Sequence, residues 1–259
     1  LGALMSLFIS LQFTEAALKA WAWRVPFILG GIFGFIALYL RSYLKETPVF
    51  KAMRAKKELA KELPVKQVLL SHKTAVGIGM LFTWFLTGCV VVLILAMPNL
   101  LVASFGFERA DAFKMQSAAI LMQMLGCIIA GVLADRFGAG KVILLGSIFV
   151  AAMAGIFYHS LGHVEASTVF MLYMLLGLSS GTVGMVSYSM VKMFPAQIRF
   201  SGISFSYNLA YAIAGGITLP LVQWLSLYSN IGALYYIWTV CLVTLFTALL
   251  YRSKFEKTA

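Results

Sequence analysis

Seven apolar runs constrain the fold of this chain more than any other feature. Each holds about 20 residues or more, which a helix rising roughly 1.5 Å per residue needs to cross about 30 Å of hydrocarbon. The mean hydropathy of +0.93 leaves too little polar surface for a water-soluble domain. We therefore predict an all-α membrane protein with complete spans at 25–44, 75–97, 115–134, 142–161, 167–191, 203–225 and 232–251.

The first residues, LGALMSLFISLQF, are apolar but too short to cross a bilayer. They begin without an initiator Met or the basic segment of a signal peptide. We therefore expect residues 1–12 to be the outer half of an eighth helix, and the chain to be the C-terminal part of a longer protein.

Basic residues predict the orientation of the spans. All but four of the 20 Lys and Arg lie in 41–73, in the turns near 135–141 and 192–202, or after residue 251. The four exceptions, in the alternate connections, are Lys19, Arg24, Arg109 and Lys114. The positive-inside rule then places the long linker, both turns and the C-terminus in the cytoplasm, with the spans in the inner (plasma) membrane.

The net charge of +11 has an explanation in this topology and in contact with anionic lipid of the bilayer. The sequence has no aromatic and basic surface motif that would indicate nucleic acid as a partner.

Residues 45–73 interrupt the apolar pattern with mixed charges and helix-forming residues. Pro48 and Pro64 are expected to break the segment, because proline cannot continue a helix. We predict a partly helical cytoplasmic linker that acts as a solvated connector. A lipid-surface or regulatory role is the alternative.

The turn GVLADRFGAGK, residues 131–141, carries three charges between two spans. Gly138 and Gly140 permit backbone angles that other residues resist. The carboxylate of Asp135 favours a cation or a helix N-terminus at the membrane edge. From the residues alone, the turn is either a solvated connection or a site that holds this carboxylate.

The same turn resembles the cytoplasmic loop motif of the major facilitator superfamily, in its second-half copy. The matching residues are Gly131, Asp135, Arg136, Gly138 and Lys141. Three further stretches resemble the metabolite:proton symporter branch, which includes proline/betaine, α-ketoglutarate, citrate and shikimate carriers. They are WRVPFILGGIFGFIALYLRSYLKETPVF, MPNLLVASFGF and MFPAQIRFSGISFSYNLAYAIAGG.

The resemblance implies twelve helices in two six-helix domains, which rock about a central site to give alternating access. Residues 1–44 would end the N-terminal domain, with the partial helix 1–12 and the span 25–44. Residues 45–73 would be the linker, and 74–259 the C-terminal six-helix domain. The expected fold is a major facilitator helical bundle with its last seven complete spans, and the missing N-terminal half is expected as a partner.

The resemblance also implies a cytoplasmic gate. We expect Asp135 to hold a basic partner, with Arg199 nearest by family topology, or the N-terminus of a neighbouring helix, when the cytoplasmic side is closed. The gating candidates are Gly131, Asp135, Arg136, Gly138, Lys141 and Arg199. The chain departs from the family pattern at Ala139 and Gly140, where basic residues are common, and at Lys192, where an acid is frequent.

Polar side chains inside the spans predict the lining of a solute site, because they are costly in hydrocarbon unless they face another helix or a water-filled cavity. Ser204, Asn208 and Tyr211 follow one helix face at i, i+4 and i+7. The substrate-binding candidates are Trp84, Thr87, Gln123, Tyr188, Tyr207, Asn208 and Tyr211. Hydrogen bonding between helices is the alternative role for each of them.

Two pairs of glycines, Gly30 with Gly34 and Gly177 with Gly181, have the GxxxG spacing that lets helices approach closely. We expect them to serve packing within the bundle, with dimerisation as the alternative.

The function expected from these features is secondary active transport of a small organic solute, with coupling to H+ implied by the resemblance. The aromatic and neutral lining favours an osmolyte such as proline or betaine, because a quaternary ammonium can be held by cation–π contacts. A di- or tricarboxylate carrier, and a non-transporting receptor or scaffold on the same fold, are the alternatives.

Other chemistry has little support in the sequence. No catalytic constellation or nucleotide loop is present in or beside the spans, so an enzyme is not expected. Cys89, Cys127 and Cys241 lie in separate spans, and neither a disulfide nor a metal is assigned to them. His159 and His163 have the spacing of a zinc pair, but we interpret them as interfacial residues. No cofactor is expected.

Overall fold

The chain folds as a set of long helices. The computed structural model describes residues 5, 8–9, 11–43, 64–229 and 231–256, and none of these residues forms a strand. The elements in chain order are α2 (Glu15–Ala20), η1 (Ala22–Arg24), α3 (Val25–Arg41), α5 (Pro64–Ser71), α6 (Lys73–Gly88), η2 (Cys89–Leu95), α7 (Met97–Phe105), α8 (Arg109–Phe137), α9 (Ala139–Ser160), α10 (Ala166–Ser180), η3 (Gly181–Gly184), α11 (Met185–Met193), α12 (Arg199–Tyr228), α13 (Gly232–Tyr251) and η4 (Arg252–Glu256).

Seven helical segments among the described residues are long and apolar enough to cross a membrane, which confirms the predicted all-α membrane fold. Several of them extend beyond the apolar runs. The run at 115–134, for example, lies within a helix from Arg109 to Phe137. The reason is that a helix continues through the polar headgroup region, where charged side chains are solvated and end the apolar pattern but not the backbone hydrogen bonds.

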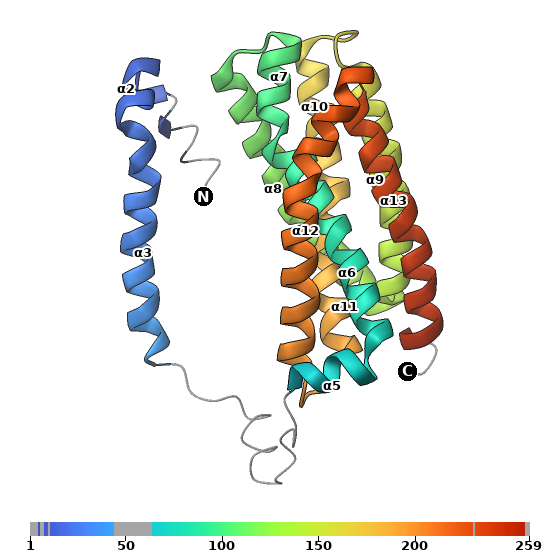
Figure 1. The fold of residues 1–259 in the computed structure, drawn as a ribbon. Helices are drawn as coiled ribbons and strands as arrows, with labels where there is room; N and C mark the ends of the chain where they lie inside the picture. The colour runs from blue at the N-terminus through green and yellow to red at the C-terminus, as the bar shows by residue number, and fades with distance from the viewer. Residues whose placement is uncertain (1–4, 6–7, 10, 44–63, 230, 257–259) are drawn as a thin grey trace.

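Six of the spans pack into one bundle, whereas α3 stands beside it (Figure 1). No residue of α3 is buried, and Gly30 and Gly34 have no neighbour where a Cβ would lie. This GxxxG pair therefore packs on no described helix. Most of the predicted linker, residues 44–63, lies outside the described residues, and Pro64 is the first residue of α5.

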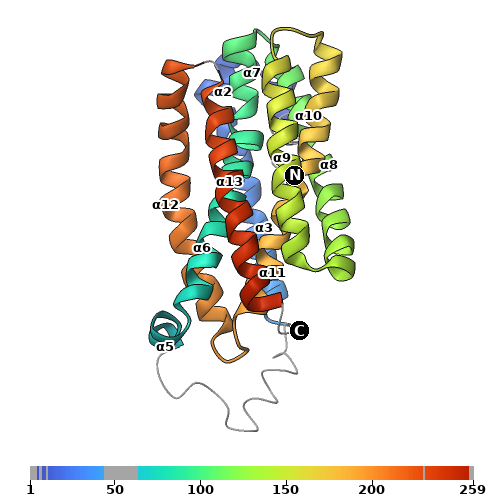
Figure 2. The same cartoon turned by 90° about the vertical axis from the view of Figure 1, so that its right-hand side faces the viewer.

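The two ends of the bundle hold different connections. Helix α5, the turn between α8 and α9, and the C-terminus lie at one end, and the connections from α9 to α10 and from α12 to α13 lie at the other (Figure 2). Helices α12 and α8 form opposite flanks in this view. The basic residues of α5, of the turn between α8 and α9 and of the C-terminal segment are thereby at one end of the spans.

Close packing of α10 on α8 depends on the second glycine pair. A Cβ on Gly177 would overlap the carbonyl oxygen of Ala119, and one on Gly181 would overlap the backbone of Gly126. The two backbones are therefore in direct contact, as the spacing of Gly177 and Gly181 predicted for packing within the bundle.

The span that begins with α6 ends in a π-helix, η2, in which a backbone N–H bonds to the carbonyl five residues before it, as Ala96 does to Val91. Two of its carbonyls also accept bonds from outside the helix. Side chains from two other helices supply donors. The Tyr173 hydroxyl of α10 donates to the carbonyl of Leu93 at 2.9 Å, and Nε2 of Gln116 in α8 donates to that of Ile94 at 2.8 Å. These bonds matter in a bilayer, where no water can replace them.

We expect Gly177→Ala to destabilise the bundle by about 1–3 kcal/mol, because the added methyl group must push α10 away from α8. The measurement is thermal unfolding of the purified chain in detergent. Gly216→Ala is the control, since a Cβ at Gly216 would meet nothing within 4 Å. Equal stability of the two variants would contradict the close contact.

Candidate functional site

A polar and aromatic stripe lies on the exposed face of α12. The rings of Tyr207 and Tyr211 stack with their centroids 5.6 Å apart and 14° between their planes. Asn208 is exposed beside them, and its Nδ2 donates to the carbonyl of Ser204 at 2.8 Å. Because this bond uses the donor side of the amide, the Asn208 side-chain oxygen is left to accept a hydrogen bond. The stripe therefore offers ring faces and an acceptor, without a net charge.

Trp84 anchors a chain of hydrogen bonds between three helices. Its Nε1 donates to the hydroxyl of Tyr236 at 2.8 Å, and that hydroxyl lies 2.6 Å from Oγ1 of Thr218. Thr218 in turn donates to the carbonyl of Ala214. Since Thr218 has one proton and gives it to a carbonyl, Tyr236 must be the donor to Thr218. The chain links α6, α13 and α12.

A cavity of about 260 Å³ lies beside this chain of hydrogen bonds. It is lined by Met80, Leu81, Trp84, Ala210, Ile213, Ala214, Ile217, Leu221 and Tyr236. The lining is almost wholly apolar, and Tyr207 and Tyr211 are not part of it. The indole ring of Trp84 thus borders a cavity, but its N–H group already has a partner.

Thr87 lies in the packed interior. Its side chain is fully buried, and its hydroxyl donates to the carbonyl of Thr83 at 2.8 Å. Thr83 makes the same bond to Gly79, so each hydroxyl is satisfied within its own helix. In this structure the hydroxyl of Thr87 serves helix packing and is closed to a solute.

The remaining two candidates lie on other helices. Nε2 of Gln123, in α8, is buried and has no hydrogen-bond partner among the described residues. The ring of Tyr188, in α11, is covered by the ammonium of Lys192 at 4.6 Å from the ring centroid. Gln123 therefore keeps an unused donor, while one face of Tyr188 is occupied by a cation of the chain itself.

The structure brings Tyr207, Tyr211 and Asn208 together but spreads the other candidates. Gln123 and the α12 stripe come from opposite flanks of the bundle (Figure 2), with α11 in contact with both flanking helices. The seven residues do not enclose one pocket. They are distributed over several helices of the bundle.

The turn with the loop motif is shorter than the sequence indicated, because Gly138 alone separates α8 from α9. Gly138 has φ +89°, a left-handed backbone that favours glycine, as predicted. Gly140 does not have a left-handed backbone, because it lies in the first turn of α9. The left-handed glycines of the described chain are Gly106, Gly138 and Gly162. The expectation that Gly140 serves a special backbone angle was wrong, and space at its Cβ position is the physical reason for glycine there.

The other gating candidates lie at this end of the bundle. Asp135 is exposed and makes no hydrogen bond or ion pair with any residue that the structure describes. Nε of Arg199 donates to the carbonyl of Phe194 at 3.1 Å, so the expected pair of Asp135 with Arg199 is not formed in this structure. Arg136 lies over the ring of Phe137 at 5.4 Å, and a Cβ at Gly131 would meet no neighbour.

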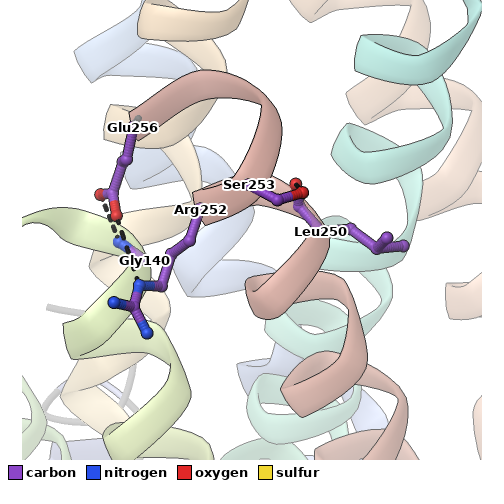
Figure 3. A network of polar contacts seen from close by, with 5 residues as sticks. All are labelled: Gly140, Leu250, Arg252, Ser253 and Glu256. Atoms are coloured by element: carbon purple, nitrogen blue, oxygen red, sulfur yellow. Dashed lines mark hydrogen bonds and ion pairs between the residues drawn. The ribbon is translucent and has the colours of Figure 1, made fainter. Parts of the chain in front are cut away.

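An acid that the sequence analysis missed occupies the N-terminus of α9. Oε1 of Glu256 accepts a hydrogen bond from the backbone N–H of Gly140 at 2.6 Å, and its Oε2 lies 3.9 Å from Nε of Arg252 (Figure 3). Together with Asp135, Lys141 and Lys192, these two side chains line a cavity of about 670 Å³. No local pattern could reveal the contact, because 116 positions separate its partners.

Metal chemistry has no geometric support in the part of the chain that the structure describes. No group of three or more His, Cys, Asp or Glu side chains there could hold a metal ion. The three cysteines are free thiols, two of them buried.

Comparison with known proteins relates this chain to one family of membrane transport proteins. A family model described as Major Facilitator Superfamily matches residues 1–218. An inner membrane metabolite transport protein of Escherichia coli, YhjE, is 30% identical over 235 residues, which cover 88% of this chain and 53% of that protein. The glycine betaine/proline/ectoine/pipecolic acid transporter OusA of Dickeya dadantii is 26% identical over 99% of this chain and 53% of its own length. A proline/betaine transporter of Salmonella typhimurium is 27% identical over 96% of this chain and 52% of its own length.

The chain thus spans about half the length of the curated relatives that it matches. These relatives are named as transport proteins rather than enzymes.

We expect Tyr236→Phe to destabilise the bundle by about 1–3 kcal/mol, because Trp84 loses its acceptor and Thr218 a donor in a buried setting. Thermal unfolding in detergent measures the change. Tyr235→Phe is the matched control, since Tyr235 is 44% exposed and its hydroxyl makes no hydrogen bond within the described chain. An unchanged midpoint for Tyr236→Phe would show that the hydrogen-bonded chain contributes nothing.

Proposed function

The chain belongs to the major facilitator superfamily, and on this premise we propose that the complete protein is a secondary active transporter that moves a small organic solute by alternating access. The observation that carries the proposal is the stacked pair of Tyr207 and Tyr211 beside Asn208, on the exposed face of a membrane-spanning helix. Polar groups on such a face are costly against lipid, so a polar cavity is the setting that suits them.

The domain organisation forms part of the same proposal. Residues 1–44 belong to the end of a first six-helix domain, 45–73 link the domains, and 74–259 form the second. The absence of buried residues in α3 supports this division, because a helix of the first domain would find its packing partners there rather than on the described bundle. The solute site would lie between the two domains, and this chain would supply one half of it.

We infer that the solute is a zwitterion or a quaternary amine, such as proline or betaine. The aromatic faces of the stripe on α12 suit a quaternary ammonium, which cannot donate hydrogen bonds, and the amide oxygen of Asn208 can accept a hydrogen bond from the ammonium of proline. Two of the relatives are named as transporters of proline and betaine. Coupling to H+ would require an acid in the site, and we place that acid in the first domain, because no Asp or Glu lies in the middle of the described spans.

A di- or tricarboxylate is the second candidate solute. One observation favours it: Lys141, Lys192 and Arg252 line a cavity at the end of the bundle that holds the turn between α8 and α9. A receptor or scaffold on the same fold would bind a ligand without moving it. Uptake by proteoliposomes containing the complete protein distinguishes a transporter from such a scaffold.

We also propose that Gly131, Asp135, Arg136, Gly138, Lys141 and Arg199 belong to a cytoplasmic gate. The exposed carboxylate of Asp135 supports this role, because it is free to bind a cation or a helix N-terminus of the other domain when the cytoplasmic side closes. A contact made in one state only is what shifts a conformational equilibrium.

Replacing Tyr211 by Ala in the complete protein should raise the apparent KM for proline or betaine about 2- to 30-fold, the range that corresponds to a cation–π contact. Tyr211→Phe is the matched control, since it keeps the ring and should transport nearly as the original protein does. Radiolabelled uptake into proteoliposomes measures both. Transport of a quaternary amine with the same KM in Tyr211→Ala would remove this ring from the site.

The proposed orientation gives a separate prediction. In a variant without the three native cysteines, a cysteine at Lys254 should react with an impermeant maleimide only from the cytoplasmic side. One at His163, in the exposed connection between α9 and α10 at the other end of the bundle (Figure 1), should react only from outside. Labelling of both from one side would overturn the topology.

A further inference from the structure

The C-terminal segment η4 lies against the start of α9, and one carboxylate makes the contact (Figure 3). The first N–H groups of a helix have no partner within the helix, and the macrodipole favours an anion beside them. A side chain at the N-cap normally fills this role. In α9 the N-cap residue is Gly138, which has no side chain, so the cap comes from Glu256 instead.

The two glycines of the turn make room for this contact. A Cβ on Gly140 would overlap Cγ of Arg252 and would lie 2.7 Å from Oε2 of Glu256. A Cβ on Gly138 would lie 3.1 Å from Oε1 of the same carboxylate. The backbone angle of Gly140 does not require glycine, so the approach of the C-terminal segment is what its missing side chain permits.

Charged side chains of both signs surround the contact between Glu256 and Gly140. Arg252 lies one helical turn before Glu256, with its Nε 3.9 Å from the second oxygen of the carboxylate. Lys141 and Lys192 line the same cavity, and Asp135 is its second acid. Glu256 occupies the N-terminus of α9, while the carboxylate of Asp135 is exposed at the last turn of α8, where it can meet a partner from outside the bundle.

We propose that Glu256 is a positioning residue of the cytoplasmic gate. Its carboxylate fixes the first turn of α9 to the end of α13, and thereby holds in place the single-residue turn that follows Asp135. The structural part of this inference stands on the contact itself, whereas its effect on gating rests on the proposed transport function.

Hydrogen exchange at the amide of Gly140 tests the contact directly, in the absence of any solute. In Glu256→Ala this amide should exchange roughly 5- to 30-fold faster, as expected for the loss of a helix cap. Glu256→Gln should have a smaller effect, because its amide oxygen still accepts the bond but carries no charge. Lys254→Ala is the control, since this neighbouring side chain is exposed, and it should leave the exchange unchanged.

A second variant approaches the contact from the other side. Gly140→Ala should displace the C-terminal segment and increase the exchange of residues 252–256, whereas Gly216→Ala should not. If Glu256→Ala exchanges at Gly140 like the original chain, or if Gly140→Ala leaves residues 252–256 protected, Glu256 does not position the turn.

The effect on gating requires the complete protein in proteoliposomes. Glu256→Ala should lower the turnover number for the solute while its KM stays within about twofold, and Glu256→Gln should restore part of the turnover, as weakened capping predicts. Faster exchange without a change in turnover would overturn the gating role and leave the cap as a structural contact. Failure of the unmutated protein to take up any solute would overturn the proposed function, and with it the gating role, while the exchange data would still decide the contact.

Discussion

In the hydrocarbon core of a bilayer, a polar group that has no partner within the protein has none at all. The bundle follows this constraint closely. The buried hydroxyls of Thr83, Thr87 and Ser206 donate to carbonyls of their own helices, and two carbonyls of η2 accept bonds from Tyr173 and Gln116. Buried polar groups without a hydrogen-bond partner are therefore exceptions to this constraint. Nε2 of Gln123 and the hydroxyl of Tyr158 are such groups within the described chain.

The same constraint explains how the helices are held together. Lipid is as apolar as a leucine side chain, so burial of apolar surface does little to drive one helix onto another. Backbone contact through Gly177 and Gly181, and the hydrogen bonds from Trp84 through Tyr236 to Thr218, supply specific attraction instead. The glycine contact joins α10 to α8, and the chain of hydrogen bonds joins α6, α12 and α13. The bundle thus contains two sets of helices that are each tied by short-range contacts.

The spans could be predicted from the sequence because length and hydropathy alone decide whether a helix fits a bilayer. The packing of Gly177 and Gly181 agrees with their GxxxG spacing, but Gly30 and Gly34 have the same spacing without a described neighbour, so the spacing alone does not decide the contact. The environment of Thr87 could not be predicted, because the same i, i+4 pattern serves a cavity or a helix interface. The cap on α9 was equally hidden: Glu256 and Gly140 meet only after the whole bundle has formed. Contacts between distant segments leave no periodic trace in a single sequence.

The π-helix η2 has a consequence for comparing this chain with its relatives. A π-turn accommodates one residue more than an α-turn, so η2 acts as an insertion of a single residue near the end of the span that begins with α6. Each residue of an α-helix turns the chain by about 100°, and an extra one rotates everything after Leu95 by that angle relative to an unbroken helix. A helical wheel that treats 75–97 as one unbroken α-helix therefore places the residues after Leu95 on the wrong face relative to the start of the span. In a relative that lacks this residue, the residue aligned with Met97 would lie on a different face of the helix. A substitution transferred between the two proteins would then change a different surface of the helix.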